Sequence, residues 1–298
     1  MGSLKKINTV LRGIRKHPLA RRHVFQAYCR FFGWQVSQLF SPGFKKKHFI
    51  ENTCLSVKKG MTGATGNIYC GLHEFEDMTF LLHFLRKEDT FLDVGANIGS
   101  YTVLSAGVCG AKTISFEPAP LTYNYLLRNV ELNKLNERVT TWNAAVGAEP
   151  GEISFTSGLD TVNHVLANYE TEDSVRVEVY ALDDLISREE NVSLIKVDTE
   201  GFETEVLKGM PALLKSPALK AIIIELNGSG ERYGFNENDI HLKLLEHGFL
   251  PHGYDPFLRK IFPLKTFNSY NTIYLRDPEF VVDRVRGSRK IKILSEYI

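Results

Sequence analysis

The chain has 298 residues, a net charge of +1 and 43% hydrophobic residues, values typical of a globular protein with one core domain of about 200 residues and an appendage. No run reaches the ~18 apolar residues that a membrane-spanning helix needs, and the first 30 residues lack the apolar segment of a signal peptide. The four cysteines show no C-x-x-C spacing, which argues against a zinc site and a disulfide framework. We expect a reduced, cytoplasmic setting.

The charge is unevenly distributed along the chain. Residues 1–50 hold 11 of the 36 Lys and Arg residues and no Asp or Glu, so residues 51–298 carry a net charge of −10. This asymmetry indicates an anionic partner for the first segment, either a membrane surface or a polyanion, and we expect no nucleic-acid partner. We divide the chain into a basic helical extension (1–50), a main domain (51–280) and a basic tail (281–298).

The first predicted element is an amphipathic helix over residues 18–41, which Pro18 begins and Ser41-Pro42-Gly43 ends. Its apolar residues recur at helical spacing: Val24, Tyr28, Phe31, Phe32, Val36, Leu39 and Phe40. One interpretation is that this face packs on the main domain, which is the usual role of such a face. The other is a peripheral contact of residues 18–47 with an anionic membrane, assisted by Lys45, Lys46 and Lys47.

The rest of the chain alternates between strand and helix patterns. Two short strands around a turn at 60–63 are predicted within residues 53–73, before a helix at 76–85. Strands are predicted at 90–94, 112–117, 139–146, 175–179, 194–198, 221–225, 249–253 and 272–275, and helices at 98–108, 119–134, 202–208 and 237–247. Such alternation predicts an α/β fold with a doubly wound, mostly parallel sheet.

The most informative segment is Thr90–Thr102, which reads as a strand, a glycine-containing turn and a helix. Glycines in this turn let the backbone approach a ligand closely. Asp93 stands two residues before Gly95, where a carboxylate would repel a pyrophosphate but suits a cationic amino acid group such as that of S-adenosylmethionine (SAM). The turn also departs from the dinucleotide pattern G-x-G-x-x-G, because Asn97 occupies its middle position.

Polar residues stand at the ends of the predicted strands: Asp93, Glu117, Asn143, Asp198 and Glu225. Ligands of open α/β sheets bind beyond the carboxyl ends of the strands, so we expect these side chains to share one cleft. Glu117 follows Gly95 by 22 positions, where a carboxylate accepts hydrogen bonds from a ribose. The alternative is that Glu117 is a capping partner of the helix that Pro118 begins.

The segment Lys196–Glu203 places three carboxylates at a strand-to-helix turn: Asp198, Glu200 and Glu203. Methyl transfer from a sulfonium requires alignment of the acceptor oxygen and removal of its proton. Asp198 suits both tasks, whereas Glu203 fits a helix cap better. His73 and His164 are alternative bases. Oxygens of Asp198, Glu225 and Asn227 also suit a divalent metal ion, which the sequence leaves open.

These motifs resemble the FkbM family of SAM-dependent methyltransferases. The resemblance spans about residues 70–250 and rests on Phe91–Thr102, Phe116-Glu-Pro118, Asn143–Gly147 and Ile195–Gly209, with further similarity at Gly71–Glu76 and Leu182–Leu185. It implies a class I, Rossmann-like methyltransferase fold with a seven-stranded sheet. It also implies a SAM donor and an acceptor hydroxyl on a natural product, glycolipid or polysaccharide.

The resemblance also implies roles for individual residues. The Asp93–Gly99 loop, with Gly95, Asn97 and Gly99, would contact the methionine part of SAM, and Glu117 the ribose. Asn143 and Ala144 would lie near the adenine, and Glu74 near the amino acid end. Asp198 would face the methyl group. From the residues themselves, we also count Glu200 and His73 among the candidate catalytic residues. His73 departs from the family pattern, which often has an aromatic residue there.

We therefore expect a SAM-dependent O-methyltransferase acting on a hydroxylated small molecule or glycan, such as a sugar, glycolipid or polyketide-like acceptor. Two alternatives remain at this stage. The first is a nicotinamide-dependent oxidoreductase on the same type of fold, and the second is a non-enzymatic, membrane-associated binding module.

Overall fold

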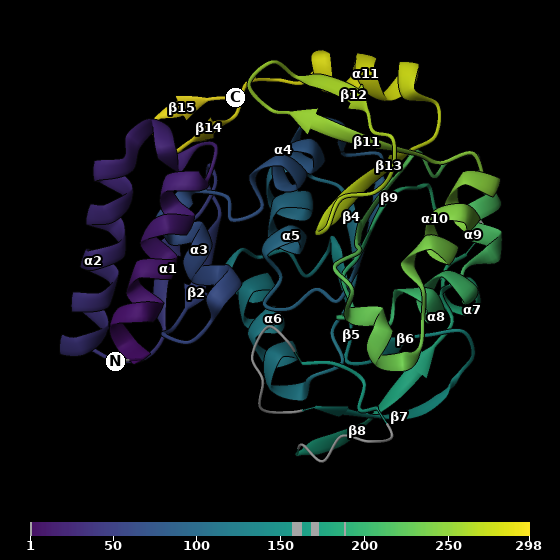
Figure 1. Ribbon diagram of the computed structural model, residues 1–298, viewed down its shortest axis with the longest axis horizontal. Coiled ribbons are helices and arrows are strands. Elements are labelled where there is room, and N and C mark those ends of the chain that lie inside the picture. The colour runs from purple at the N-terminus through teal and green to yellow at the C-terminus, as the bar shows by residue number, and fades with distance from the viewer. Residues whose placement is uncertain (1, 157–162, 168–172, 188) are drawn as a thin grey trace.

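The structure is a computed structural model that describes residues 2–298 except 157–162, 168–172 and 188. Its centre is an eight-stranded sheet with the order β12-β11-β13-β10-β9-β3-β4-β5 (Figure 1). Five neighbouring strands run parallel: β5 (Val139–Trp142), β4 (Lys112–Phe116), β3 (Thr90–Val94), β9 (Val192–Val197) and β10 (Ala221–Glu225). The predicted mostly parallel α/β sheet is confirmed.

The other end of the sheet is antiparallel. Strand β13 (Asn271–Leu275) lies between β10 and β11 (Leu250–Asp255) and runs opposite to both. Strand β12 (Lys260–Pro263) pairs with β11 as a hairpin and forms the edge. The seven strands implied by the family resemblance are therefore present, and the hairpin adds an eighth that the sequence pattern did not indicate.

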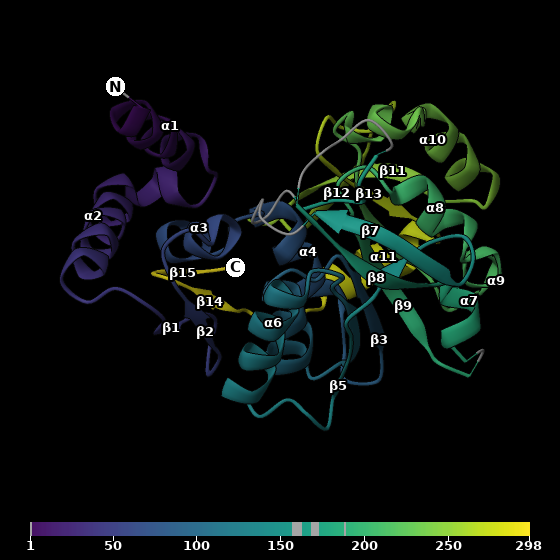
Figure 2. The same ribbon diagram turned by 90° about the horizontal axis from the view of Figure 1, so that it is seen from below.

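Helices cover both faces of this sheet (Figure 2). On one face lie α4 (Phe75–Phe84), α5 (Ser100–Val103) with its π-helical continuation (Leu104–Cys109), and α6 (Pro120–Leu132); on the other lie α7 (Leu182–Leu185), α8 (Glu203–Lys208), α9 (Pro211–Lys215) and α10 (Glu237–Glu246). Alternation along β3 explains this division, because Phe91 packs into the first core and Leu92 into the second.

The predicted strand at 139–146 is interrupted at Asn143. Its first half is β5 of the main sheet, and its second half, β6 (Ala145–Val146), joins a small sheet with β8 (Ser174–Tyr180) and β7 (Gly151–Thr156). The Asn143 amide stabilises the break, since its nitrogen donates to the carbonyl oxygens of Glu117 and Pro118, both at 2.9 Å.

The N-terminal part contains α1 (Gly2–Lys16), a 3₁₀ turn (Ala20–His23), α2 (Val24–Phe40), the β1–β2 hairpin (Lys45–His48, Cys54–Val57) and α3 (Thr62–Cys70). The prediction of a second strand within 53–73 was wrong, because this segment forms α3. The helix is buried on most of its surface, by Ala64, Thr65, Gly66, Asn67, Tyr69 and Cys70, so its sequence shows no one-sided helical pattern.

The tail packs on this N-terminal part. After α11 (Pro278–Arg286), strands β14 (Lys292–Ile293) and β15 (Glu296–Tyr297) pair, and the Glu296 carboxylate contacts both Arg22 and His23. Buried residues of both termini, such as Trp34 and Ile293, belong to the same core cluster as the first face of the sheet. The boundaries at residues 50 and 280 stay predictions.

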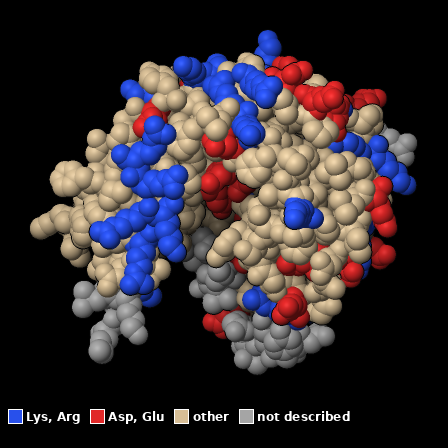
Figure 3. All heavy atoms as spheres, turned by 45° about the horizontal axis from the view of Figure 1, so that its top comes forward, with Lys and Arg blue, Asp and Glu red and all other residues tan. Residues whose placement is uncertain are grey.

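Helix α2 has two apolar sides. Phe31 and Trp34 are buried, as the packing interpretation expects, but Phe32, Leu39 and Phe40 are 50%, 74% and 87% exposed. Beside α2, Figure 3 shows a band of Lys and Arg side chains over α1. Within the described residues, no helix combines the length and apolar character needed to cross a bilayer.

Candidate active site

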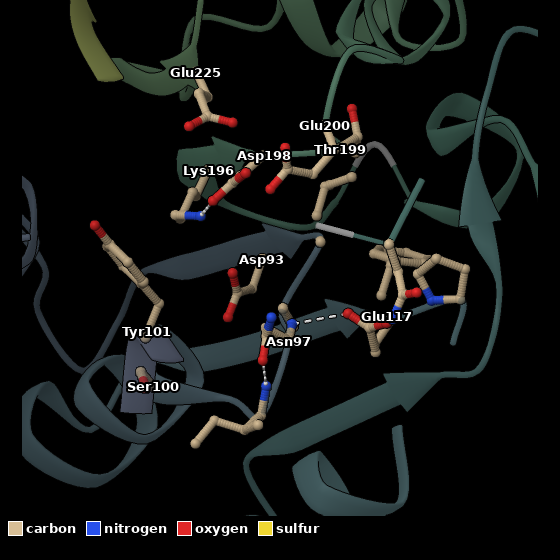
Figure 4. Close-up of a pocket in the computed structure, with 18 of the residues that line it drawn as sticks. Asp93, Asn97, Ser100, Tyr101, Glu117, Lys196, Asp198, Thr199, Glu200 and Glu225 are labelled. Atoms are coloured by element: carbon tan, nitrogen blue, oxygen red, sulfur yellow. Dashed lines mark hydrogen bonds and ion pairs between the residues drawn. The ribbon is translucent and has the colours of Figure 1, made fainter. Parts of the chain in front are cut away.

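A cavity of about 250 Å³ lies at the carboxyl ends of β3 and β9, where the strand order of the sheet reverses. Six carboxyl side chains line it: Glu74, Asp93, Glu117, Asp198, Glu200 and Glu225. Figure 4 labels all of them except Glu74. Among the described lining residues, Lys196 is the one Lys or Arg. Of the five strand-end residues predicted to share one cleft, Asp93, Glu117, Asp198 and Glu225 line this cavity and Asn143 does not. The described lining residues carry more acidic than basic groups.

The turn after β3 is built around three left-handed residues: Gly95, Asn97 and Gly99, with φ angles of 79°, 50° and 84°. A Cβ on Gly95 would lie 1.8 Å from the backbone oxygen of Asp198. Gly95 is therefore required because two loops of the protein meet there, a reason different from the close ligand approach we expected. Gly99 lies outside the cavity lining, and a Cβ there would meet Leu126 at 2.5 Å.

Glu117 joins this turn to the start of α6. One carboxylate oxygen accepts a hydrogen bond from the backbone N–H of Asn97 and the other from that of Ala119, both at 2.9 Å (Figure 4). This geometry is compatible with both interpretations of Glu117, as a helix-capping partner and as a ribose ligand. Glu117 bonds to the backbone at the start of α6, and it also lines the cavity. Each oxygen keeps a further lone pair for a ligand hydroxyl. Burial raises the pKa of Glu117 to about 7.

The cavity wall beside Glu117 is apolar. It is formed by Phe116, Pro118, Ala144, Ala145, Val146, Phe155, Val165 and Phe202. Ala144 is part of this wall, and its contact with an adenine stays a prediction. Asn143 does not line the cavity, and its amide instead bonds to the backbone of Glu117 and Pro118. An apolar wall next to a hydrogen-bonding carboxylate is suited to a nucleoside.

Asp93 lies on the opposite side of the turn and is 1% exposed. Its carboxylate accepts a 2.6 Å hydrogen bond from the Thr102 hydroxyl. Burial raises the pKa of Asp93 to about 6, although the nearby Lys196 ammonium opposes this shift. A positively charged ligand would stabilise the ionised form of this buried carboxyl group.

Two residues of this region were missed by the sequence reasoning, Tyr101 and Lys196. The Tyr101 hydroxyl donates to Glu74 at 2.5 Å, and the Lys196 ammonium lies 4.8 Å from the centre of the Tyr101 ring. Lys196 is 3% exposed and pairs with Asp198 at 2.5 Å. Burial alone lowers the pKa of Lys196, but the surrounding carboxylates outweigh it and raise the pKa above its ordinary value. A lysine inside an otherwise apolar strand was the available signal.

Carboxyl oxygens of Asp198, Glu200 and Glu225 lie within 4.8 Å of one another. Burial and the neighbouring Asp198 raise the pKa of Glu200 to about 7 and that of Glu225 well above its usual range. One Glu225 oxygen is buried without a hydrogen-bond partner. Such a cluster can share protons or hold a divalent cation. Asn227, the third residue of the predicted metal set, instead accepts a hydrogen bond from the Ser229 backbone.

The remaining predicted residues fall into two groups. Glu203 accepts hydrogen bonds from the Thr199 hydroxyl and from the backbone N–H groups of Thr199 and Gly201, so it caps the turn as expected. His73 and Glu74 line the cavity from the segment between α3 and α4. The His73 backbone is held by the Asn67 side chain at 2.7 Å.

Residues 93–251, more than half of the chain, match the family described as the methyltransferase FkbM domain. The chain belongs to the FkbM methyltransferase family. This confirms the resemblance found in the sequence. It also argues against the nicotinamide-dependent oxidoreductase, which the absence of G-x-G-x-x-G had already disfavoured.

Relatives of the FkbM chain include named methyltransferases. The hexuronic acid methyltransferase AglP of Haloferax volcanii is 30% identical over 158 residues, which cover 52% of this chain and 62% of the relative. Methyltransferase 1 of Beauveria bassiana is 32% identical over 148 residues, which cover 41% of this chain and 59% of the relative. The chain thus spans about three fifths of the length of these relatives.

A solved structure with similarity to the chain is the methyltransferase FkbM from Methylobacillus flagellatus, at 16% identity and a TM-score of 0.45. The match covers 72% of this chain and 52% of that one. The roles of the cavity residues follow from the geometry described above and stay predictions.

Proposed function

We propose that this FkbM-family chain is a SAM-dependent O-methyltransferase that acts on a sugar hydroxyl. The observation that carries the proposal is the composition of the cavity, whose described lining residues include six carboxyl groups and one ammonium group. A donor with positive charges on its sulfonium and amino groups fits such a wall, whereas the pyrophosphate of a dinucleotide is repelled by it.

The residues of the cavity form three regions that fit the parts of SAM. Asp93 and Glu74 supply negative charge for the amino group, and Glu117 offers acceptor positions for the ribose hydroxyls. The apolar wall that includes Ala144 and Phe155 accommodates the adenine ring. When bound, SAM supplies an electrophilic methyl group on its sulfonium.

The acceptor side is the carboxyl cluster of Asp198, Glu200 and Glu225. Asp198 is held in place by Lys196 at 2.5 Å and orients the acceptor hydroxyl. Glu200, whose pKa lies near 7, is suited to accept the hydroxyl proton at neutral pH. The buried Glu225 oxygen without a partner offers a further hydrogen-bonding position for the acceptor. This arrangement aligns an oxygen nucleophile before transfer.

The similarity to a hexuronic acid methyltransferase supports a sugar as the acceptor class. The experiment is a calorimetric titration of the protein with SAM and, separately, with NADH, followed by incubation with labelled SAM and panels of sugars, glycolipids and polyketides. We expect SAM binding and labelling of a sugar panel. Binding of NADH without binding of SAM would overturn the proposal that SAM is the donor. Labelling confined to polyketides would overturn the proposal that the acceptor is a sugar.

The same assay separates the two uses of the carboxyl cluster. Turnover is measured after treatment with EDTA and after addition of Mg²⁺. Turnover that survives EDTA assigns the cluster to proton transfer. Turnover that disappears with EDTA and returns with Mg²⁺ assigns these oxygens to a divalent cation that positions the acceptor.

A further inference from the structure

We propose that α2 docks the protein on the surface of an anionic phospholipid bilayer. The docking element is the outer face of α2, which we define as Phe25, Cys29, Phe32, Val36, Leu39 and Phe40. These residues follow one another at intervals of one, three or four positions and lie on one side of the helix. The proposal concerns where the enzyme acts and is independent of the proposed acceptor.

The outer face of α2 is exposed although its residues are large and apolar. The exposed fractions are 80% for Phe25, 50% for Phe32 and Val36, 74% for Leu39 and 87% for Phe40. The opposite side of the helix, with Ala27, Phe31 and Trp34, is buried in the core. Packing in the core therefore accounts for the apolar residues on the inner side of α2 but not for those on the outer face. A contiguous apolar patch of this kind marks an interaction surface.

Exposed apolar residues elsewhere do not form such a row. Among the described residues outside α2, the apolar side chains that are 56–74% exposed lie on separate segments of the chain: Leu121, Leu242, Leu258, Tyr270 and Tyr297. Single exposed apolar residues are ordinary in globular proteins and need no partner. The α2 face is different because five large side chains share one helix side.

Charge identifies the occupant of this face. Residues 1–50 hold 11 Lys and Arg and no acidic residue, and Lys6, Arg12, Lys16 and Lys46 are exposed. The band of Lys and Arg over α1 runs beside the uncharged surface of α2 (Figure 3). An anionic lipid surface satisfies both features, since it offers negative headgroups and an apolar interior. A second copy that docked through this same segment would bring positive charge against positive charge and be repelled.

A groove next to the outer face adds to this match. It is lined by Gly33 of α2 and by Arg30, Lys47 and Lys292. The one acidic lining residue, Glu51, already pairs with Arg289. A phosphate headgroup entering beside Gly33 would therefore meet cationic side chains while the aromatic rings of α2 enter the boundary between headgroups and acyl chains.

The test is co-sedimentation of the full chain with vesicles of phosphatidylcholine alone and with vesicles that also contain phosphatidylserine. We expect binding to the phosphatidylserine vesicles that weakens as salt is raised, and little binding to phosphatidylcholine alone. Replacing Phe32→Ser and Phe40→Ser together should weaken binding by about tenfold or more. Replacing Arg12→Gln should weaken it by roughly fivefold.

The matched control is the double variant Leu242→Ser and Leu258→Ser, which removes two equally exposed apolar residues on other elements and should bind as the unchanged protein does. The α2 variants should keep the SAM affinity and the thermal unfolding temperature of the unchanged protein, which would show that their fold is intact. Unchanged vesicle binding by the Phe32 and Phe40 variant would overturn the proposal. A second outcome would also overturn it. If light scattering shows that the unchanged protein is a dimer and that this variant is a monomer, the outer face of α2 binds a second copy of the chain.

Discussion

The ammonium nitrogen of Lys196 lies 2.5 Å from the Asp198 carboxylate, beside the face of the Tyr101 ring. The pair lies at the end of β9. Asp93 of the neighbouring strand β3 is next to Lys196, because the two residues are partners in the parallel register. Lys196 thus lies between Asp198, two residues along its own chain segment, and Asp93 on the neighbouring strand, whose pKa it lowers. The predictions below begin with this pair.

Replacing Lys196→Met should lower the free energy of unfolding by about 3–5 kcal/mol, because it leaves buried carboxylates without their counter-charge. The double variant with Asp198→Asn should be less destabilised than the sum of the single variants. Urea unfolding measures these differences. Lys208→Met is the control, since Lys208 pairs with Glu205 at the surface and should cost less than about 1 kcal/mol. Equal losses for Lys196→Met and Lys208→Met would contradict the buried role.

Replacing Gly95→Ala should destabilise the protein by at least about 2 kcal/mol. The residue has a φ of 79°, and an added Cβ would collide with the Asp198 backbone oxygen. Gly151→Ala is the control, because nothing lies within 4 Å of its added Cβ, and its change should stay within about 1 kcal/mol. If both variants unfold at the same urea concentration, the two loops do not meet as described.

Replacing Glu117→Gln should weaken SAM binding roughly 10- to 100-fold, since a charged hydrogen-bond acceptor for the ribose is lost. Calorimetric titration measures this change. The control is Glu137→Gln, because Glu137 is exposed and follows α6, the helix that Glu117 precedes. This variant should leave the SAM affinity unaltered. An unchanged affinity of the Glu117 variant would place the nucleoside elsewhere.

Replacing Glu200→Gln should lower kcat by roughly 10²–10⁴ without weakening SAM binding, as expected for loss of a general base. Asp198→Asn should also abolish turnover, because the acceptor is no longer oriented. Glu205→Gln, in the first turn of α8, is the control and should keep full activity. If Glu200→Gln is active and His73→Gln is not, the base is the histidine.

SAM affinity should increase as the pH rises from about 5 to 8 and then level off. The pKa values of Asp93 and Glu117 are raised by burial to about 6 and about 7, so these groups hold protons in the folded protein that the unfolded chain has lost. Their contribution to stability is therefore complete below about pH 4 and is lost as the pH rises through 6–7.

A cationic ligand favours the ionised carboxylates, so its binding should release protons below pH 7. Calorimetry in two buffers of different ionisation enthalpy counts these protons. Asp93→Asn should reduce the release. A pH-independent affinity with no proton release would show that these carboxyl groups do not face the donor.

Several features of the site could be predicted from local sequence because they depend on short stretches of backbone. The turn after β3 follows from its glycines and Asn97, and Glu117 and Asp198 follow apolar strands that end at the same edge of a parallel sheet. Other features could not be predicted this way. The segment at 62–70 became α3, and α2 buried one side while exposing the other, because neighbours distant in sequence decide such packing.

The order of apolar and polar residues determined the α/β alternation, the parallel strands and the carboxylates at their ends, because backbone periodicity acts over a few residues. The tertiary structure alone decided which groups surround the Lys196–Asp198 pair. It placed Tyr101 and Asp93 beside Lys196 and left one Glu225 oxygen without a partner, since electrostatic interactions in a buried cavity depend on distances between segments that only folding brings together.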